Sequence, residues 1–260
     1  MYLAGLTATA AAALGAVVGF LAGGLVNLVA ARLGPQPGTC GYCGRQADWG
    51  GAWAVINYVR RKGVCPSCTA PLQLRPLLVE LSSAVGLSLL WHQVGDGAGS
   101  SLVWRVVFQS AYLLVLLLVS VTDLEQRRIP DVVMVPALFL ALLGAFLSPA
   151  GNWRNSLMGG AAAGAFFLLL YLLGKLVARW LRREGNALGG GDVKLATFVG
   201  LTTGLQRGAV ALGLGIVLAG VVAGIVIVVR LLQGRYRPGM SMPYGPFLAA
   251  GAALVLLLAP

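Results

Sequence analysis

Two aspartates stand where apolar stretches of the chain begin or end, and such a pair could carry out acid–base chemistry. Asp192 follows the glycines of "NALGGGDVKLA" and opens the apolar run "VKLATFVGLTTGL", while Asp123 closes the run "YLLVLLLVSVTD". A carboxylate is costly to place at the depth of a bilayer, so each is a candidate functional residue. If the two face each other, they would share one proton, and one could deprotonate water while the other donates to a carbonyl oxygen.

Each aspartate also has a purely structural interpretation. Asp123 could be a charge at the end of a helix, and Asp192 could cap a helix and interact with its dipole. Glycines at 189 to 191 favour the functional interpretation, because Gly189 and Gly191 would let an extended peptide approach Asp192 closely. Lys194 could pair with a carboxylate or extend to the membrane surface. With Gly189 and Gly191, it is also a candidate substrate-binding residue.

Other acidic residues near Asp123 have a simpler interpretation. Glu125 and Asp131 stand beside Arg127 and Arg128. Four charges of both signs in a short connection are typical of a solvated loop. We therefore expect no chemistry from these two acids.

All four cysteines of the chain lie in one loop, as Cys40-Gly-Tyr-Cys43 and Cys65-Pro-Ser-Cys68. Two CxxC pairs about twenty residues apart are typical of a zinc ribbon, in which four thiolates bind one structural Zn²⁺. A β-prone segment, "DWGGAWAVINYVR", could bridge the two pairs. Iron bound as in rubredoxin, two disulfides and unrelated thiols are the alternatives, and disulfides are disfavoured in a reducing cytoplasm.

The rest of the chain predicts a membrane protein. Only 10% of the 260 residues are charged, and the mean hydropathy is +0.85, which a soluble surface does not allow. Apolar runs near the length of a bilayer-spanning helix predict an all-α polytopic protein with about eight transmembrane helices in the lipid bilayer. The runs fall near 5–31, 77–95, 102–122, 130–148, 156–178, 193–205, 207–229 and 244–259.

The basic residues predict the orientation of these helices. The net charge of +11 could suggest nucleic acid, but the Lys and Arg residues fall in loops and act as topology signals, so no nucleic-acid partner is expected. All but Arg105, Arg154 and Arg207 lie on one side. That side is predicted to be cytoplasmic and to hold the cysteine loop and both aspartates, with both termini outside. We predict a first helix (1–31), a cytoplasmic cysteine-rich domain (32–76) and a transmembrane domain with the aspartates (77–260).

Four motifs in order resemble the bacterial type IV prepilin peptidases, a family of intramembrane aspartyl proteases. Gly189-Gly-Gly-Asp192 resembles the GxGD signature of these proteases, and Thr122-Asp123-Leu124 before Ile129-Pro130-Asp131 resembles the motif of the first aspartate. The stretch Pro243-Tyr-Gly-Pro-Phe-Leu-Ala249 is similar to a C-terminal Pro-Phe-Gly-Pro-Phe motif. The paired CxxC loop, followed by Leu74-Arg-Pro-Leu-Leu-Val-Glu-Leu81, resembles the stretch leading into the second span.

This resemblance implies a specific activity at the cytoplasmic face of the inner membrane. Asp123 and Asp192 would be the catalytic pair that removes the short basic leader from type IV prepilins or pseudopilins. Many members also methylate the new N-terminus with S-adenosylmethionine, through the cysteine-bearing loop. Such a methyltransferase domain would here contain the zinc ligands Cys40, Cys43, Cys65 and Cys68.

Two other classes of protein remain as alternatives. A transporter or secretion assembly factor with a zinc-ribbon loop could use the aspartates to carry ions or protons. Ion sites, however, more often place acids in mid-span among polar neighbours or broken helices. A presenilin-like or archaeal preflagellin peptidase would share GxGD but would lack the four-cysteine loop.

Overall fold

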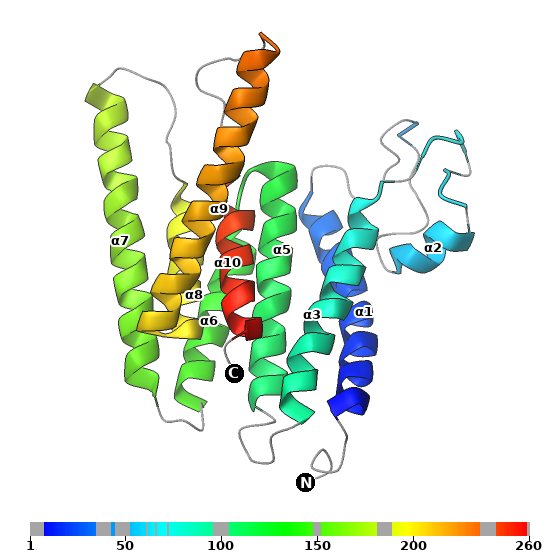
Figure 1. The fold of residues 1–260 in the computed structure, drawn as a ribbon, viewed down its shortest axis with the longest axis horizontal. Coiled ribbons are helices and arrows are strands. Elements are labelled where there is room, and N and C mark those ends of the chain that lie inside the picture. Colours follow the sequence, from blue (N-terminus) through cyan, green and yellow to red (C-terminus); the bar gives the residue numbers. More distant parts are fainter. Residues whose placement is uncertain are drawn as a thin grey trace. The chain divides into compact units, whose positions relative to one another are not determined.

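A computed structural model describes most of the chain, and the regular structure of the described residues is helical (Figure 1). Each of the eight apolar runs expected from the sequence corresponds to a helix of this structure. The described residues divide into two compact units, one up to Thr122 and one from Asp123 onward. The structure describes residues 8–34, 43–44, 53–60, 62–65, 67–71, 73–95, 104–147, 152–180, 189–234 and 243–258.

The first unit is built on two closely packed helices, α1 (Ala8–Leu33) and α3 (Arg75–Gly95). Gly15, Gly19 and Gly23 of α1 face α3 at one-turn spacing, and at each of them an added methyl group would collide with α3. Small residues four apart let two helix backbones approach closely, as is common between membrane helices. A π-helical segment, η1 (Arg105–Gln109), leads into α5 (Ser110–Gln126), whose last turn belongs to the second unit.

The segment between the two cysteine pairs does not form the β-structure that its sequence suggested. Its described part contains a short helix, α2 (Ala54–Arg60), which contacts α3. The carboxylate of Glu80 on α3 accepts hydrogen bonds from the backbone N–H groups of Ala54 (2.5 Å) and Val55 (2.9 Å). An acceptor from outside the segment thus satisfies the first N–H groups of α2, and this outweighs the β-propensity of its branched residues.

Five helices form the second unit: α6 (Asp131–Leu147), α7 (Trp153–Trp180), α8 (Gly190–Thr203), α9 (Leu205–Leu232) and α10 (Gly245–Leu258). Helix α8 contacts all the other four. Its side chains supply much of the core, since Leu195, Ala196, Phe198 and Val199 are fully buried. A helix of 14 residues is about 21 Å long, less than the thickness of a bilayer core. Asp192 therefore lies in the first turn of a short helix that packs inside this unit.

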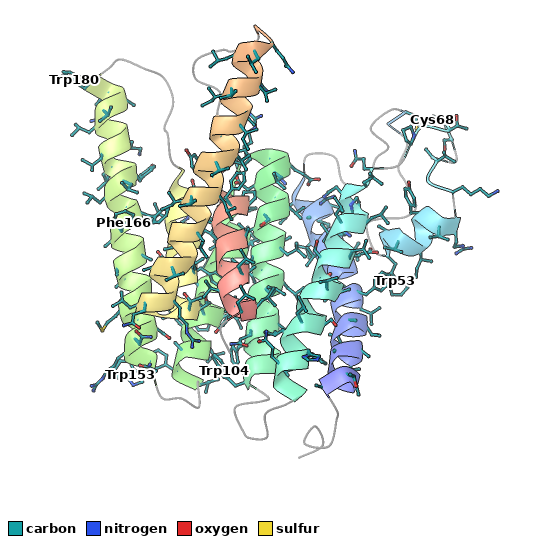
Figure 2. All side chains as sticks on the ribbon, in the orientation of Figure 1. Trp53, Cys68, Trp104, Trp153, Phe166 and Trp180 are labelled. Carbon is teal, nitrogen blue, oxygen red and sulfur yellow. The ribbon has the colours of Figure 1, made fainter. Side chains whose placement is uncertain are left out.

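Four described helices are long and apolar enough to cross a membrane: α1, the segment Val106–Gln126, α7 and α9. Helices α6 and α10 are apolar but shorter. Large apolar side chains project from α7 along its length, and Phe166 and Trp180 are largely exposed (Figure 2). A surface of this kind is stable in lipid rather than in water, so the chain is a multi-pass membrane protein. The count of eight spans and the three predicted domains stay predictions.

Candidate functional site

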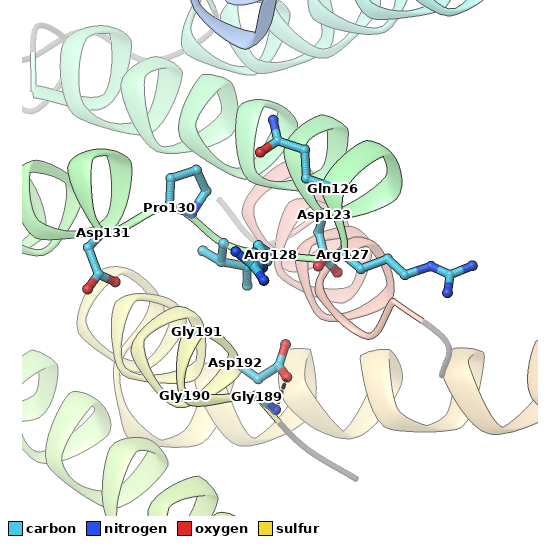
Figure 3. Close-up of a pocket in the computed structure, with 11 residues that line it drawn as sticks. Asp123, Gln126, Arg127, Arg128, Pro130, Asp131, Gly189, Gly190, Gly191 and Asp192 are labelled. Carbon is cyan, nitrogen blue, oxygen red and sulfur yellow. Dashed lines mark hydrogen bonds between the residues drawn. The ribbon is translucent and has the colours of Figure 1, made fainter. Parts of the chain in front are cut away.

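A pocket of about 430 Å³ in the second unit brings the two aspartates together. The close-up of this pocket shows both carboxylates directed into the same space (Figure 3). Asp123 comes from the last turn of α5 and Asp192 from the first turn of α8. The lining residues are Asp123, Gln126, Arg127, Arg128, Ile129, Pro130, Asp131, Gly189, Gly190, Gly191 and Asp192.

The carboxylate of Asp123 is buried against the start of α10, with only 5% of the residue exposed. Its Oδ2 atom accepts a hydrogen bond from the backbone N–H of Gly245 at 2.9 Å. Gly245 is the first residue of α10, so the carboxylate also lies at the positive end of a helix dipole. The role of Gly245 was not predicted from the Pro-Tyr-Gly-Pro motif that contains it. In the sequence, Gly245 is distinguished by its position between Pro243 and Pro246.

Asp192 occupies a comparable position at the start of its own helix. Its Oδ2 atom accepts a hydrogen bond from the backbone N–H of Gly189 at 2.9 Å, and its own N–H donates to the carbonyl of Gly189. Gly189 is the N-cap residue of α8, and the carboxylate of Asp192, three residues later, completes the cap by bonding back to it. The capping role and the pocket are compatible, because only one carboxylate oxygen accepts the N–H.

The electrostatics of the pocket connect the two acids. Asp192 lies outside the four helices that are long enough to cross a membrane. Burial raises the pKa of Asp192 to about 6; the Gly189 hydrogen bond lowers this pKa and the negative charge of Asp123 raises it. An acid with a pKa near neutrality, next to a second carboxylate, is suited to exchange a proton during a reaction.

The three glycines before Asp192 have different surroundings. A methyl group added at Gly191 would lie 2.7 Å from Cβ of Ile129, so the close packing of α8 against the α5–α6 connection requires a glycine. Among the described residues, no atom lies within 4 Å of the corresponding position at Gly190. A peptide could therefore approach the backbone at Gly190. At Gly191 the corresponding space is filled by Ile129. Substrate binding by Gly189 and Gly191 stays a prediction.

Lys194 forms an ion pair with Asp131, with 2.5 Å between Nζ and Oδ1. Of the two alternatives left open for Lys194, the structure has the pairing with a carboxylate. Lys194 is not among the residues that line the pocket, and substrate binding by Lys194 stays a prediction. The interpretation of Asp131 as part of a solvated loop is wrong in one respect. Its side chain is 68% exposed, but it lines the pocket and contacts a residue 63 positions away.

Three of the four cysteines meet in the first unit. The sulfur atoms of Cys43, Cys65 and Cys68 all lie within 4.8 Å of one another, and none of these three residues forms a disulfide (Figure 2 labels Cys68). A tight turn shapes the second pair: Cys65 donates its N–H to Ala70 and accepts the N–H of Thr69. Converging thiols at this separation suit a tetrahedral metal site. Cys40, the fourth predicted ligand, lies outside the described residues.

A buried polar cluster that the sequence analysis missed connects the cysteine-bearing segment to α1 and α3. Asn27 and Glu80 are almost completely buried. Asn27 donates from Nδ2 to the carbonyl of Pro76 at 2.9 Å and, at 3.5 Å, to Glu80. An acid inside an apolar run is the signal that could have identified Glu80.

Comparison with known proteins identifies the family of this chain. Residues 110–229 match the model of the type IV leader peptidase family, and residues 17–94 match the bacterial peptidase A24 N-terminal domain. The prepilin leader peptidase/N-methyltransferase of Bacillus subtilis is 30% identical over 223 residues, which cover 84% of this chain and 80% of that protein. The chain belongs to the type IV leader peptidase family.

Other members of the family show similar relationships. Proteins with the same name from Pseudomonas aeruginosa and Dichelobacter nodosus are 29% and 30% identical to this chain. The alignments cover 84% of this chain and 70% of each relative. No solved structure matches the chain significantly. The match at 110–229 contains both pocket aspartates, and the match at 17–94 contains all four cysteines.

Proposed function

We propose that this protein is a prepilin peptidase in which Asp123 and Asp192 are the catalytic residues. Its substrates are type IV prepilins or pseudopilins, from which it removes the basic leader. The observation that carries this proposal is the meeting of two largely buried carboxylates in one pocket, each bonded through one oxygen to a glycine N–H. Membership of the leader peptidase family supports the class of substrate.

The proposed chemistry follows from the shared proton of the pair. The ionised carboxylate takes a proton from a water molecule, and the oxygen of that water attacks the scissile carbonyl carbon. The protonated carboxyl group donates its proton to the carbonyl oxygen. The N–H groups of Gly189 and Gly245 fix the orientation of the two acids. The second oxygen of each carboxylate is then available to water and substrate.

The distribution of basic residues supports cleavage at the cytoplasmic face. Arg127 and Arg128 follow Asp123, and Lys194 follows Asp192, so three cations flank the pocket. Loops rich in Lys and Arg remain on the cytoplasmic side of bacterial membranes. In this orientation both termini lie outside. The cysteine-bearing segment and the pocket lie on the cytoplasmic side, where the basic leader of the substrate remains.

A second activity, N-methylation of the new N-terminus, is favoured by the match to the N-terminal domain of the family and by the names of the relatives. S-adenosylmethionine would supply the methyl group. Cys43, Cys65 and Cys68 fit a Zn²⁺ ion, with Cys40 as the proposed fourth ligand. Four thiolates complete the coordination of zinc, so the ion would hold the segment in shape rather than contact the substrate.

The test of the peptidase is cleavage of a co-expressed prepilin by the wild type and by Asp123→Asn and Asp192→Asn. We expect both variants to lose cleavage, because an amide can neither take up nor release the required proton. Glu125→Gln is the matched control: this exposed acid stands two residues from Asp123 but does not line the pocket. Cleavage by either aspartate variant would contradict the catalytic pair and favour a transporter or assembly factor.

A further inference from the structure

We propose that Asp131 and Lys194 are a positioning pair that holds the start of α8 against the start of α6 and thereby keeps Asp192 facing Asp123. This inference rests on the proposed function for its effect on catalysis. It concerns the structure of the pocket itself, so it can also be tested without a substrate.

Asp131 has a fixed position relative to Asp123 because the connection between them is short. Arg127 closes α5 with a hydrogen bond from its N–H to the carbonyl of Asp123 at 2.8 Å. Three residues later the carbonyl of Pro130 accepts the N–H groups of Val133 and Met134 and opens α6. Asp131 is the first residue of α6. Asp131 can therefore move only together with the end of α5.

The start of α8 meets this connection through one face. Gly191 and Lys194 are three residues apart and share a side of the helix. Gly191 packs on Ile129, and Lys194 pairs with Asp131. Two contacts at successive turns fix both the distance of the helix end and its rotation about its axis. With that face held, the neighbouring residue Asp192 is directed into the pocket toward Asp123 (Figure 3).

The ion pair between Asp131 and Lys194 is too exposed to contribute much to the stability of the fold. The side chain of Lys194 is 38% exposed and that of Asp131 is 68% exposed, and exposed pairs contribute little to folding. Catalysis is far more sensitive to position, since a displacement of about 1 Å in a reacting group can reduce a rate about 100-fold. The effect of the pair is therefore expected in turnover rather than in unfolding.

The first experiment breaks and then reverses the pair. Asp131→Asn and Lys194→Gln are each expected to reduce kcat for a prepilin about 10-fold, with little change in KM. Their combination should be no worse than either change alone. Exchange of the charges, Asp131→Lys with Lys194→Asp, should recover most of kcat. Glu125→Gln controls for the loss of a nearby exposed charge.

The second experiment reports the position of Asp192 without any substrate. A hydrophobic carbodiimide modifies protonated carboxyl groups, so labelling of Asp192 against pH gives the midpoint of its titration. If the pair only acts through its charges, Asp131→Asn should lower this midpoint and Lys194→Gln should raise it. If the pair positions α8, both variants should lower it, because Asp192 moves away from Asp123 and toward water.

The outcomes separate this inference from the proposed function. A raised midpoint in Lys194→Gln, or no recovery in the charge exchange, would overturn the positioning role. A higher KM in Asp131→Asn together with a lower KM in Lys194→Gln would also overturn it, and would make Asp131 a binding residue for a positive charge on the substrate. If the wild type cleaves no prepilin, the proposed function fails, while the labelling experiment still decides the role of the pair.

Discussion

Gly245 donates its backbone N–H to Oδ2 of Asp123 at 2.9 Å, although the two residues are 122 positions apart in the chain. A methyl group added at Gly245 would lie 2.7 Å from that oxygen and 3.1 Å from the carboxyl carbon. A side chain at this position would therefore force the carboxylate of Asp123 to shift. The glycine of the Pro-Tyr-Gly-Pro motif has a physical explanation in this contact.

We predict that Gly245→Ala reduces cleavage of a prepilin about 100-fold, because the carboxylate must move by several tenths of an ångström or more. The backbone N–H is retained, so the loss would come from geometry rather than from a missing donor. The measurement is kcat with purified protein in detergent. Gly220→Ala in α9 is the control, since no atom of the described part of the chain lies within 4 Å of the added methyl group. Equal activity in both variants would contradict the prediction.

The helices were predictable from the sequence because each follows from a local property. Among the described residues, the runs of apolar residues predicted eight helices, including the short α8, whose glycine- and threonine-rich sequence is unusual for a span. The topology predicted only that Asp123 and Asp192 stand at the same side of the membrane. That the two carboxylates share one pocket is a finding of the structure.

The features that could not be predicted depend on partners far away in the chain. Val55, Ile56 and Val59 favour a strand, but Glu80 binds the first N–H groups of this segment and stabilises a helix. Asp131 has two arginines before it, yet its partner is Lys194, 63 residues later. Local patterns contain no information on such contacts, so α2 and the role of Asp131 emerged only from the structure.

The pKa of Asp192 predicts a protonation change near pH 6. Below this pH the carboxyl group is protonated and reacts with a carbodiimide, and above it the reaction declines. In Asp123→Asn the midpoint should fall, because the negative charge of Asp123 is one cause of the raised pKa. It should remain above the ordinary value for aspartate, since burial persists. Mass spectrometry of the labelled peptide gives the midpoint, and an unchanged midpoint in Asp123→Asn would mean that the two acids do not interact.

The cysteine cluster predicts about one bound metal ion per chain. Cys65→Ser removes a buried thiol from the group formed with Cys43 and Cys68, and we expect it to abolish metal binding as measured by elemental mass spectrometry. Cys40→Ser should have the same effect if Cys40 is the fourth ligand. Prepilin cleavage should persist in both variants, because the aspartates belong to the other compact unit. Methylation should be lost, and retention of a full equivalent of metal in Cys65→Ser would contradict the site.

The hydrogen bonds of Glu80 predict that the packing of α2 depends on this one side chain. The residue is completely buried, and its carboxylate accepts two backbone N–H groups of α2 and the amide of Asn27. Glu80→Gln replaces one acceptor oxygen by a donor, so at least one N–H group of α2 loses its partner, at a cost of about 1–3 kcal/mol. We expect limited proteolysis to cut the α2 segment faster and methylation to fall, while prepilin cleavage is retained.

Glu125→Gln, which removes an exposed acid, should leave both measurements unchanged. Loss of cleavage together with methylation would show instead that Glu80 supports the fold of the whole protein rather than the docking of α2.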